Sequence, residues 1–357
     1  MNILITGATG FVGKNLVDVL STEPKHQLFL ANSTTPVSDL QKWGQEVDIC
    51  IHLAGYSRTH DEADGYEKNV SYTRFLTTIL SPNVPILFAS TNAANSHHRY
   101  VETKRKEETL LQAYFSKVKI VRFDNLFGKW AAPFYNSVVA TFIHGVLENK
   151  EFPLFDEHTP KSFLYIDDAI QVIVEWIDQP DYGIAIAKGT YQQTPHDILT
   201  MIRQINEDYQ RLNTLVYDNP FQQRLAITFM SYVQPTRFFP LSAFRDARGA
   251  FLPFSKSASS GQWSINEVEV GAEKGNHYHR IRYEKFILLS GKVTLWLRHR
   301  LSDESIQIEL DRPYDTYYIP PGYIHKIINQ GSQPAVLVMW SSLVFDADHP
   351  DTYPATI

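Results

Sequence analysis

The chain of 357 residues contains a single cysteine, Cys50, so a disulfide within the chain is excluded. It has no excess of basic residues either, and its net charge of -6 offers no basic face for nucleic acid. No apolar run approaches the ~18 residues that a membrane-spanning helix needs. The first expected strand begins directly after Met1, which leaves no room for a signal peptide. These absences predict a cytoplasmic protein without nucleic-acid or membrane partners.

A glycine-rich turn follows the first apolar segment. Gly7, Gly10 and Gly13 stand between an expected strand at residues 2–6 and an expected helix at 12–21. Glycines at such a turn let backbone amides approach a pyrophosphate at the helix N-terminus, where the helix dipole favours negative charge. This placement predicts a dinucleotide-binding site at the start of the chain.

The N-terminal part alternates between short apolar runs and amphipathic segments, which predicts a doubly wound parallel sheet of the Rossmann type, an α/β fold. A second expected helix covers residues 102–114. The expected strands of this sheet are 2–6, 27–31, 49–52, 86–89 and 119–122.

After about Thr228 the sequence pattern changes to short runs of aromatic and β-branched residues separated by turn residues. This pattern predicts an all-β antiparallel barrel. The boundary is expected near Pro235 and Pro240, giving domains 1–232 and 240–357. The expected strands of the barrel are 262–270, 285–290, 292–298, 307–310, 317–319 and 335–340.

Tyr100 and Lys104 form the chemical pair of the first domain. Their spacing places a phenol and an ammonium about one turn apart on one helix face, so the cation favours the phenolate. A tyrosine in that setting can donate a proton to a carbonyl oxygen as hydride reaches its carbon. Ser90 and Thr91 end the fourth strand and could hydrogen-bond that carbonyl. The alternative for the pair alone is a solvated helix face.

These motifs, together with residues 52–55, 122–128 and 163–168, resemble the extended short-chain dehydrogenase/reductases. The resemblance implies a catalytic triad of Thr91, Tyr100 and Lys104. The cofactor-binding residues that we predict are Gly7, Thr9, Gly10, Phe11, Val12, Gly13, Asn32, Leu53, Ala54, Gly55, Tyr100, Lys104 and Asn125.

The second expected strand ends at Asn32, where a carboxylate would bind the ribose 2'-hydroxyl of NAD. No carboxylate is there to repel a 2'-phosphate, although no arginine is there to bind one. We therefore expect NADPH as the cofactor rather than NADH.

Near the C-terminus, three imidazoles and a carboxylate form a set able to hold a divalent metal ion: His277, His279, Glu284 and His325. His277 and His279 are two apart on an expected strand and face one side, and neighbouring strands must deliver the other two. Such ligands suit zinc, iron, manganese and nickel alike. Residues 271–291 and 314–329, which contain these ligands, resemble the two cupin motifs at nearly every position, with Tyr314 standing where a turn glycine is usual.

The combination of both halves resembles the capsule and O-antigen reductases that make UDP-2-acetamido-2,6-dideoxy-β-L-talose. This resemblance implies a zinc-bearing cupin domain that epimerises C3 of a 4-keto-6-deoxy UDP-sugar and a reductase domain that reduces C4 with NADPH. We also expect a homodimer. Because a 4-ketone acidifies the C3 hydrogen, epimerisation must precede reduction.

The base that removes the C3 hydrogen is left open among Lys274, Tyr278, Lys285 and Tyr323. Pro253 stands where many sugar-epimerising cupins have a carboxylate, which weakens the expectation of the second activity. Two alternatives remain at this point. The chain is a sugar 4-epimerase or dehydratase with a structural or sensory cupin, or it is a binding protein that senses redox state without catalysis.

Overall fold

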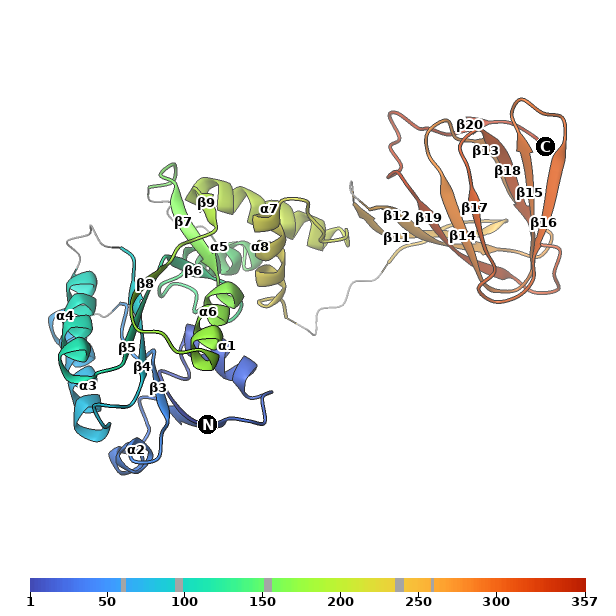
Figure 1. Cartoon of the computed structure of the whole chain (residues 1–357). Coiled ribbons are helices and arrows are strands. Elements are labelled where there is room, and N and C mark those ends of the chain that lie inside the picture. The colour runs from blue at the N-terminus through green and yellow to red at the C-terminus, as the bar shows by residue number, and fades with distance from the viewer. Residues whose placement is uncertain (59–61, 94–98, 151–155, 235–240, 258–259) are drawn as a thin grey trace. The chain divides into compact units, whose positions relative to one another are not determined.

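The computed structural model describes residues 1–58, 62–93, 99–150, 156–234, 241–257 and 260–357 (Figure 1). The predicted boundary near Pro235 and Pro240 lies outside these described residues. The chain divides into two compact units, each described here by itself. The first unit comprises Met1–Gln204 and Arg224–Val233, and the second comprises Ile205–Gln223 and Gln234–Ile357.

The first unit is built on a six-stranded parallel sheet, which confirms the predicted α/β class. Its central strands are rich in β-branched and other apolar residues and are buried on both faces, as a sheet covered by helices requires. The strand order is β2-β1-β3-β4-β5-β8, so the topology reverses between β1 and β3. The strands are β1 (Asn2–Thr6), β2 (Gln27–Ala31), β3 (Ile49–His52), β4 (Ile86–Thr91), β5 (Val118–Phe123) and β8 (Gly183–Ala187).

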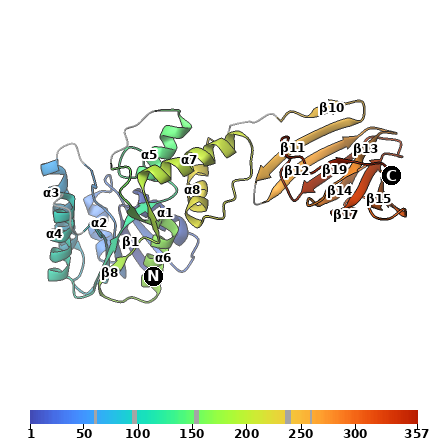
Figure 2. The same cartoon turned by 90° about the horizontal axis from the view of Figure 1, so that it is seen from above.

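Helices cover both faces of this sheet. Apolar residues of α2, α3 and α4 pack with alternate strand residues such as Leu4 and Phe88, while α1 lies against α6. Figures 1 and 2 show α3 and α4 side by side, and α1 beside α6. The helices are α1 (Phe11–Leu20), α2 (Val37–Gly44), α3 (Glu62–Ile79), α4 (Arg99–Tyr114), α5 (Val138–Leu147), α6 (Ile166–Asp178), α7 (Pro195–Gln210) and α8 (Pro220–Met230).

A smaller sheet of order β6-β7-β9 follows the carboxyl end of β5. It consists of β6 (Asn125–Phe127), β7 (Lys161–Tyr165) and β9 (Tyr191–Gln193). Asp124 joins it to the main sheet, because its carboxylate accepts hydrogen bonds from Asn92 (2.7 Å), Ser162 (2.6 Å) and the Gly189 amide (2.7 Å). Among all the described helices, none has the length and apolar character needed to cross a membrane.

Apart from Ile205–Gln223, which holds parts of α7 and α8, the second unit is all-β, as predicted, and its two main sheets share one apolar core. Phe286 and Leu337 of one sheet pack with Leu295 and Ile327 of the other. The six-stranded sheet contains β10 (Phe244–Asp246), β11 (Gly249–Ser257), β12 (Gly261–Val268), β19 (Ala335–Ser341), β14 (Glu284–Ser290) and β17 (Thr316–Ile319). The five-stranded sheet contains β16 (Ser305–Leu310), β15 (Val293–His299), β18 (Tyr323–Ile328), β13 (Glu273–Tyr278) and β20 (Tyr353–Pro354).

Strands β10 and β11 were not among the predicted strands. They form a hairpin, in which Phe244 pairs with Phe251, and β11 then extends along β12. The segment carries Pro253 and a register shift between Pro253 and Ser255. A proline and a bulge interrupt the strand pattern that sequence periodicity relies on, which explains why this edge was missed.

Candidate functional site

The glycine turn of the first unit has the close backbone packing that a pyrophosphate cradle needs. Gly7 has a φ of 70°, and a Cβ there would lie 2.7 Å from the Ala54 amide nitrogen. A Cβ on Gly13 would lie 2.1 Å from the Gly7 carbonyl oxygen. Side chains at either position would push the β1 turn away from β3 or from α1, so only glycine allows this approach.

The other predicted cofactor residues lie around the same edge of the sheet. Thr9 and Gly10 complete the turn, Phe11 and Val12 begin α1, and Leu53, Ala54 and Gly55 directly follow β3. No side chain caps the N-terminus of α1, whose N-cap is Gly10. The backbone amides of its first turn are therefore not capped by a side chain, and they lie at the β1–β3 reversal, where doubly wound sheets bind dinucleotides.

Two predicted cofactor residues have side chains that are already engaged. The Asn32 side-chain oxygen accepts hydrogen bonds from the Thr34 amide (2.8 Å) and hydroxyl (2.7 Å), so it shapes the turn after β2. The Asn125 amide donates to the Ser162 carbonyl (2.9 Å) on the neighbouring β7. Both side chains therefore order the backbone that follows β2 and β5.

The two hydroxyl residues that end β4 point to different surroundings. Ser90 is 6% exposed, and its hydroxyl donates to the Glu108 carboxylate (2.5 Å), which also pairs with Arg122. The next residue, Thr91, is only half-buried, and its Oγ1 accepts from the Ala93 amide (3.3 Å). Because consecutive strand residues face opposite sides, Ser90 belongs to a buried ionic network and Thr91 faces the other side. Of the two hydroxyls, the one of Thr91 lies outside this ionic network.

Tyr100 and Lys104 stand one helical turn apart at the start of α4. Tyr100 is half-buried, with its ring 6.1 Å from that of Tyr66. Lys104 is 4% exposed and its ammonium lies 4.3 Å from the centre of the Phe88 ring. A Cβ on Gly55 would be 3.4 Å from that ammonium nitrogen. Lys104 therefore reaches from α4 to the loop after β3, where the predicted cofactor residues gather.

A chain of buried polar groups leads from Lys104 into the core. The ammonium lies 3.5 Å from the Glu107 carboxylate, which accepts a hydrogen bond from Thr73 (2.8 Å). Thr73 contacts His52 Nε2 (2.9 Å), and His52 Nδ1 contacts the Thr6 hydroxyl (2.7 Å). Sequence reasoning missed Glu107, although its position one turn after Lys104 on α4 was a usable signal.

The directions of these hydrogen bonds follow from the carboxylate. Since Thr73 donates to Glu107, its oxygen accepts from Nε2–H of His52, and Nδ1 then accepts from Thr6. Thr6 in turn accepts from the Ala54 amide (3.2 Å) in the predicted cofactor loop. Burial, aided by the charge of Lys104, lowers the pKa of His52 to about 3, so this imidazole is neutral at neutral pH. Each donor and acceptor in this series of hydrogen bonds has a fixed role. The series connects Lys104 to the loop after β3.

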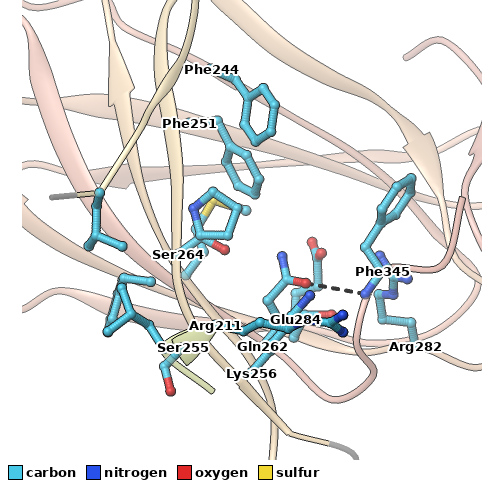
Figure 3. A pocket seen from close by; sticks show the side chains of 16 residues that line it. Arg211, Phe244, Phe251, Ser255, Lys256, Gln262, Ser264, Arg282, Glu284 and Phe345 are labelled. Carbon is cyan, nitrogen blue, oxygen red and sulfur yellow. Dashed lines mark hydrogen bonds between the residues drawn. The ribbon is translucent and has the colours of Figure 1, made fainter. Parts of the chain in front are cut away.

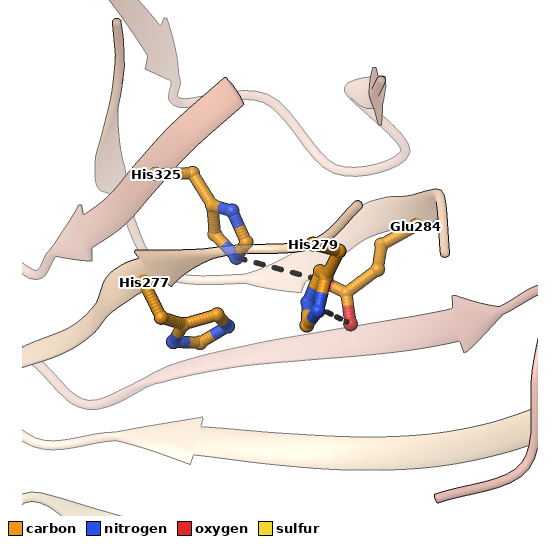
Figure 4. A group of neighbouring side chains, drawn as sticks. All are labelled: His277, His279, Glu284 and His325. Carbon is orange, nitrogen blue, oxygen red and sulfur yellow. Dashed lines mark ion pairs between the residues drawn. The ribbon is translucent and has the colours of Figure 1, made fainter. Parts of the chain in front are cut away.

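In the second unit, His277, His279, Glu284 and His325 converge, and their candidate ligand atoms all lie within 4.8 Å of one another (Figure 4). His277 on β13 is the cross-strand partner of His325 on β18, and His279 follows the end of β13. Glu284 begins β14 of the other sheet. The cluster therefore joins both sheets of the unit.

The donor set fits a divalent ion on chemical grounds. His279 Nε2 and Glu284 Oε2 are buried without a hydrogen-bond partner in the described part of the chain. The Asp351 carbonyl accepts from His279 Nδ1, which leaves the lone pair on Nε2 facing the cluster. Burial is the main cause that lowers the pKa of His277 to about 4, and the charge of His325 is the second. The His277 ring is therefore neutral and able to coordinate a metal ion. Orphaned ligand atoms of this kind are stabilised by a bound cation.

Of the four residues considered as the C3 base, Lys274 alone lines the cavity that contains the histidine cluster, as far as the described residues go. Its ammonium donates to Asn266 Oδ1 (2.7 Å) and to the carbonyls of Glu267 (2.7 Å) and Ala250 (3.2 Å). Burial lowers the pKa of Lys274, against the nearby charge of Asp246.

The other three base candidates point elsewhere. Tyr278 stacks on Tyr353, and the Lys285 ammonium lies 5.4 Å from the Tyr318 ring. Tyr323 contacts the His299 ring. Alternation along β13 and β14 turns Tyr278 and Lys285 away from the face that carries His277 and Glu284.

Two family models match separate parts of the chain. Residues 3–187 match the NAD dependent epimerase/dehydratase family, over the whole parallel sheet with its glycine turn and the Tyr100–Lys104 helix. The chain belongs to this family. Residues 244–353 match the polysaccharide biosynthesis C-terminal domain, which includes the histidine cluster.

Two relatives match this epimerase/dehydratase chain over its full length. A UDP-2-acetamido-2,6-beta-L-arabino-hexul-4-ose reductase of Pseudomonas aeruginosa is 28% identical over 368 residues, covering 100% of this chain and 99% of that protein. The crystal structure of the capsular polysaccharide assembling protein CapF from Staphylococcus aureus superposes with a TM-score of 0.89 and 34% identity, covering 100% of both chains. The predicted resemblance to capsule enzymes of this two-domain type is thus confirmed.

A solved UDP-glucose 4-epimerase from Thermotoga maritima matches 65% of this chain, with a TM-score of 0.54 and 16% identity. At that identity the likeness concerns the fold alone.

Proposed function

We propose that this protein is a UDP-sugar reductase that also epimerises its substrate. The cupin-type unit would invert C3 of a UDP-linked 2-acetamido-4-keto-6-deoxy sugar, and the first unit would reduce C4 with NADPH. The product would be UDP-2-acetamido-2,6-dideoxy-β-L-talose, used in polysaccharide synthesis. The observation that carries the proposal is that one chain holds both a Tyr100–Lys104 helix next to the loop that packs on a glycine turn and a histidine–glutamate cluster. The Pseudomonas aeruginosa relative, which matches this chain over its whole length, is named as a reductase of a UDP-linked hexul-4-ose.

In the reductase unit, we assign proton donation to Tyr100 and carbonyl positioning to Thr91. Hydride from NADPH would arrive at C4 while the Tyr100 hydroxyl gives its proton to O4, which turns the ketone into an alcohol. Lys104, held by Glu107, keeps a positive charge one turn from the phenol and beside Gly55. That charge favours the phenolate that remains after proton transfer.

In the second unit, His277, His279, Glu284 and His325 would hold one divalent ion, for which we propose zinc. A bound ion would supply a Lewis acid beside the substrate's ketone. The chain's own residues line the surrounding cavity, and Lys274 adds a cation to its wall. Removal of the C3 proton and its return to the opposite face inverts that centre, and this can occur only while the 4-ketone is intact.

The test is incubation of the purified full chain with a UDP-linked 2-acetamido-4-keto-6-deoxyhexose and NADPH, followed by NMR of the product sugar. We expect NADPH consumption and inverted configuration at C3. A matched incubation in heavy water without NADPH should incorporate deuterium at C3. Turnover that retains the C3 configuration would limit the proposal to reduction, and stable retention of NAD(H) without net consumption would indicate a 4-epimerase or dehydratase instead.

A further inference from the structure

Arg282 is a buried cation for which neither proposed reaction has a role. It stands between His279 and Glu284 in the connection from β13 to β14, and it is 7% exposed. Its Nε has no hydrogen-bond partner, and the guanidinium forms no ion pair with any described carboxylate. The Phe345 ring, 6.0 Å away, is at the outer limit of a cation–π contact.

A buried charge without a partner is costly, so its placement calls for a reason. The backbone here is held by another group: the Asp351 carboxylate accepts from the amides of Arg280 (3.0 Å), Ile281 (3.0 Å) and Arg282 (2.8 Å). The loop therefore keeps its shape independently of the Arg282 side chain. Arg280, two residues earlier, is exposed and lies over the Tyr353 ring.

Arg282 lines two adjoining cavities of the second unit. The larger, of about 570 Å³, has aromatic walls that include Phe244, Phe251 and Phe345 (Figure 3). The smaller, of about 450 Å³, contains the histidine cluster. Both are lined by Phe244, Phe251, Arg282, Glu284 and Met339, so they meet where the guanidinium lies. Each volume is in the range of small-molecule sites, which is about 300–1,000 Å³.

We propose that Arg282 binds the diphosphate of a nucleoside diphosphate sugar. The nucleoside occupies the larger cavity against the phenylalanine rings, and the sugar reaches the histidine cluster in the smaller one. A planar guanidinium matches phosphate oxygens in pairs, and a dianionic diphosphate supplies the counter-charge that Arg282 lacks within the described chain. The placement of the sugar rests on the proposed C3 epimerisation, whereas nucleotide binding is measured without turnover.

The inference is tested by calorimetric titration of the full-length, metal-loaded chain with UDP, comparing Arg282→Met with Arg280→Met. We expect Arg282→Met to bind one UDP fewer per chain than the wild type, or to bind it at least roughly 30-fold more weakly. Its melting temperature without ligand should be equal or higher, because an unpaired buried charge has been removed. Arg280→Met should titrate like the wild type.

A purely structural role for Arg282 gives a different result. In that case Arg282→Met melts at a lower temperature and loses UDP binding only in proportion to its unfolded fraction, which overturns the inference. An unchanged number and affinity of UDP sites, or an equal loss in Arg280→Met, also overturns it. If Arg282→Met loses one UDP while the wild type never exchanges the C3 hydrogen, the nucleotide site stands and the proposed epimerisation fails.

Discussion

At the scale of single residues, Tyr100 has the most direct chemical role in the proposed reduction. Tyr100→Phe keeps the ring and its packing against Tyr66 and removes only the proton donor. We expect NADPH oxidation to fall by roughly 100-fold to 10,000-fold, the usual range for losing a general acid. Deuterium incorporation at C3 in heavy water should continue at the wild-type rate. NADPH oxidation near the wild-type rate would refute the role of Tyr100.

Glu107 is the second residue whose replacement is informative, since it is fully buried beside the Lys104 ammonium. Glu107→Gln keeps an acceptor for Thr73 but leaves the buried cation without its counter-charge. We expect a loss of about 3–5 kcal/mol in the free energy of unfolding, as for other broken buried pairs. Denaturant unfolding measures it.

The matched control for Glu107→Gln is Glu102→Gln, an exposed position in the first turn of the same helix, which should change stability little. The double variant Lys104→Met with Glu107→Gln should lose less than the sum of the two single variants, because it removes both charges together. Additive losses would show that the two side chains do not interact.

At the scale of elements, the turn before β17 carries strain in its backbone. Tyr314 has a φ of 75° where the cupin motif usually has glycine, and its side chain is 76% exposed. A left-handed conformation costs a residue with a Cβ about 1–2 kcal/mol. The turn is retained because the Tyr314 amide donates to the Leu288 carbonyl (2.7 Å) and holds β17 against β14.

We therefore expect Tyr314→Gly to raise the free energy of unfolding of the second unit by up to about 1 kcal/mol. The gain is smaller than the relieved strain, because glycine has greater conformational entropy in the unfolded chain. Thermal unfolding measures the change. Tyr314→Ala removes the same side chain but keeps a Cβ, so it should bring no such gain. Equal stabilisation by both variants would mean that the exposed phenol, rather than the backbone, is unfavourable.

At the scale of the whole molecule, the two proposed reactions are assigned to separately packed units, each with its own apolar core. His279→Ala should therefore reduce bound metal and C3 exchange while NADPH oxidation on an already epimerised ketosugar persists. Loss of a single ligand should weaken metal binding by more than the roughly 10-fold to 100-fold typical of its supporting contacts. Metal content, melting temperature and both activities are measured on one sample.

A structural ion would give a different pattern in that experiment. The variant would then melt at a lower temperature, and its C3 exchange would fall only with its folded fraction. A folded, metal-free variant that exchanges at the wild-type rate would contradict both a catalytic and a structural ion.

Local patterns were sufficient for most strands of the larger sheets and for the kinds of ligand, although β8, β10 and β11 were not predicted. The glycine turn, the parallel strands and most barrel strands depend on periodicity and turn residues that lie close together in the chain. Gly7 and Gly13, for example, are needed for contacts made within a few residues of the turn or with the next strand. The sequence also predicted His277 and His279 as metal ligands, because metal coordination depends on side-chain chemistry.

The set of four ligands was predicted from the sequence, but only the tertiary structure decided from which elements they come and which other distant groups meet. Glu284 reaches the histidines from the other sheet, and Thr73 and His52 join Glu107 from α3 and β3. No sequence pattern distinguishes Arg282, and its burial beside two cavities appears only in the fold, where residues of β11, β12 and β19 line the larger cavity with it. Packing between residues distant in the sequence determines how deeply a charged side chain is buried, and therefore the free energy that its burial costs. No local sequence pattern predicts that free energy.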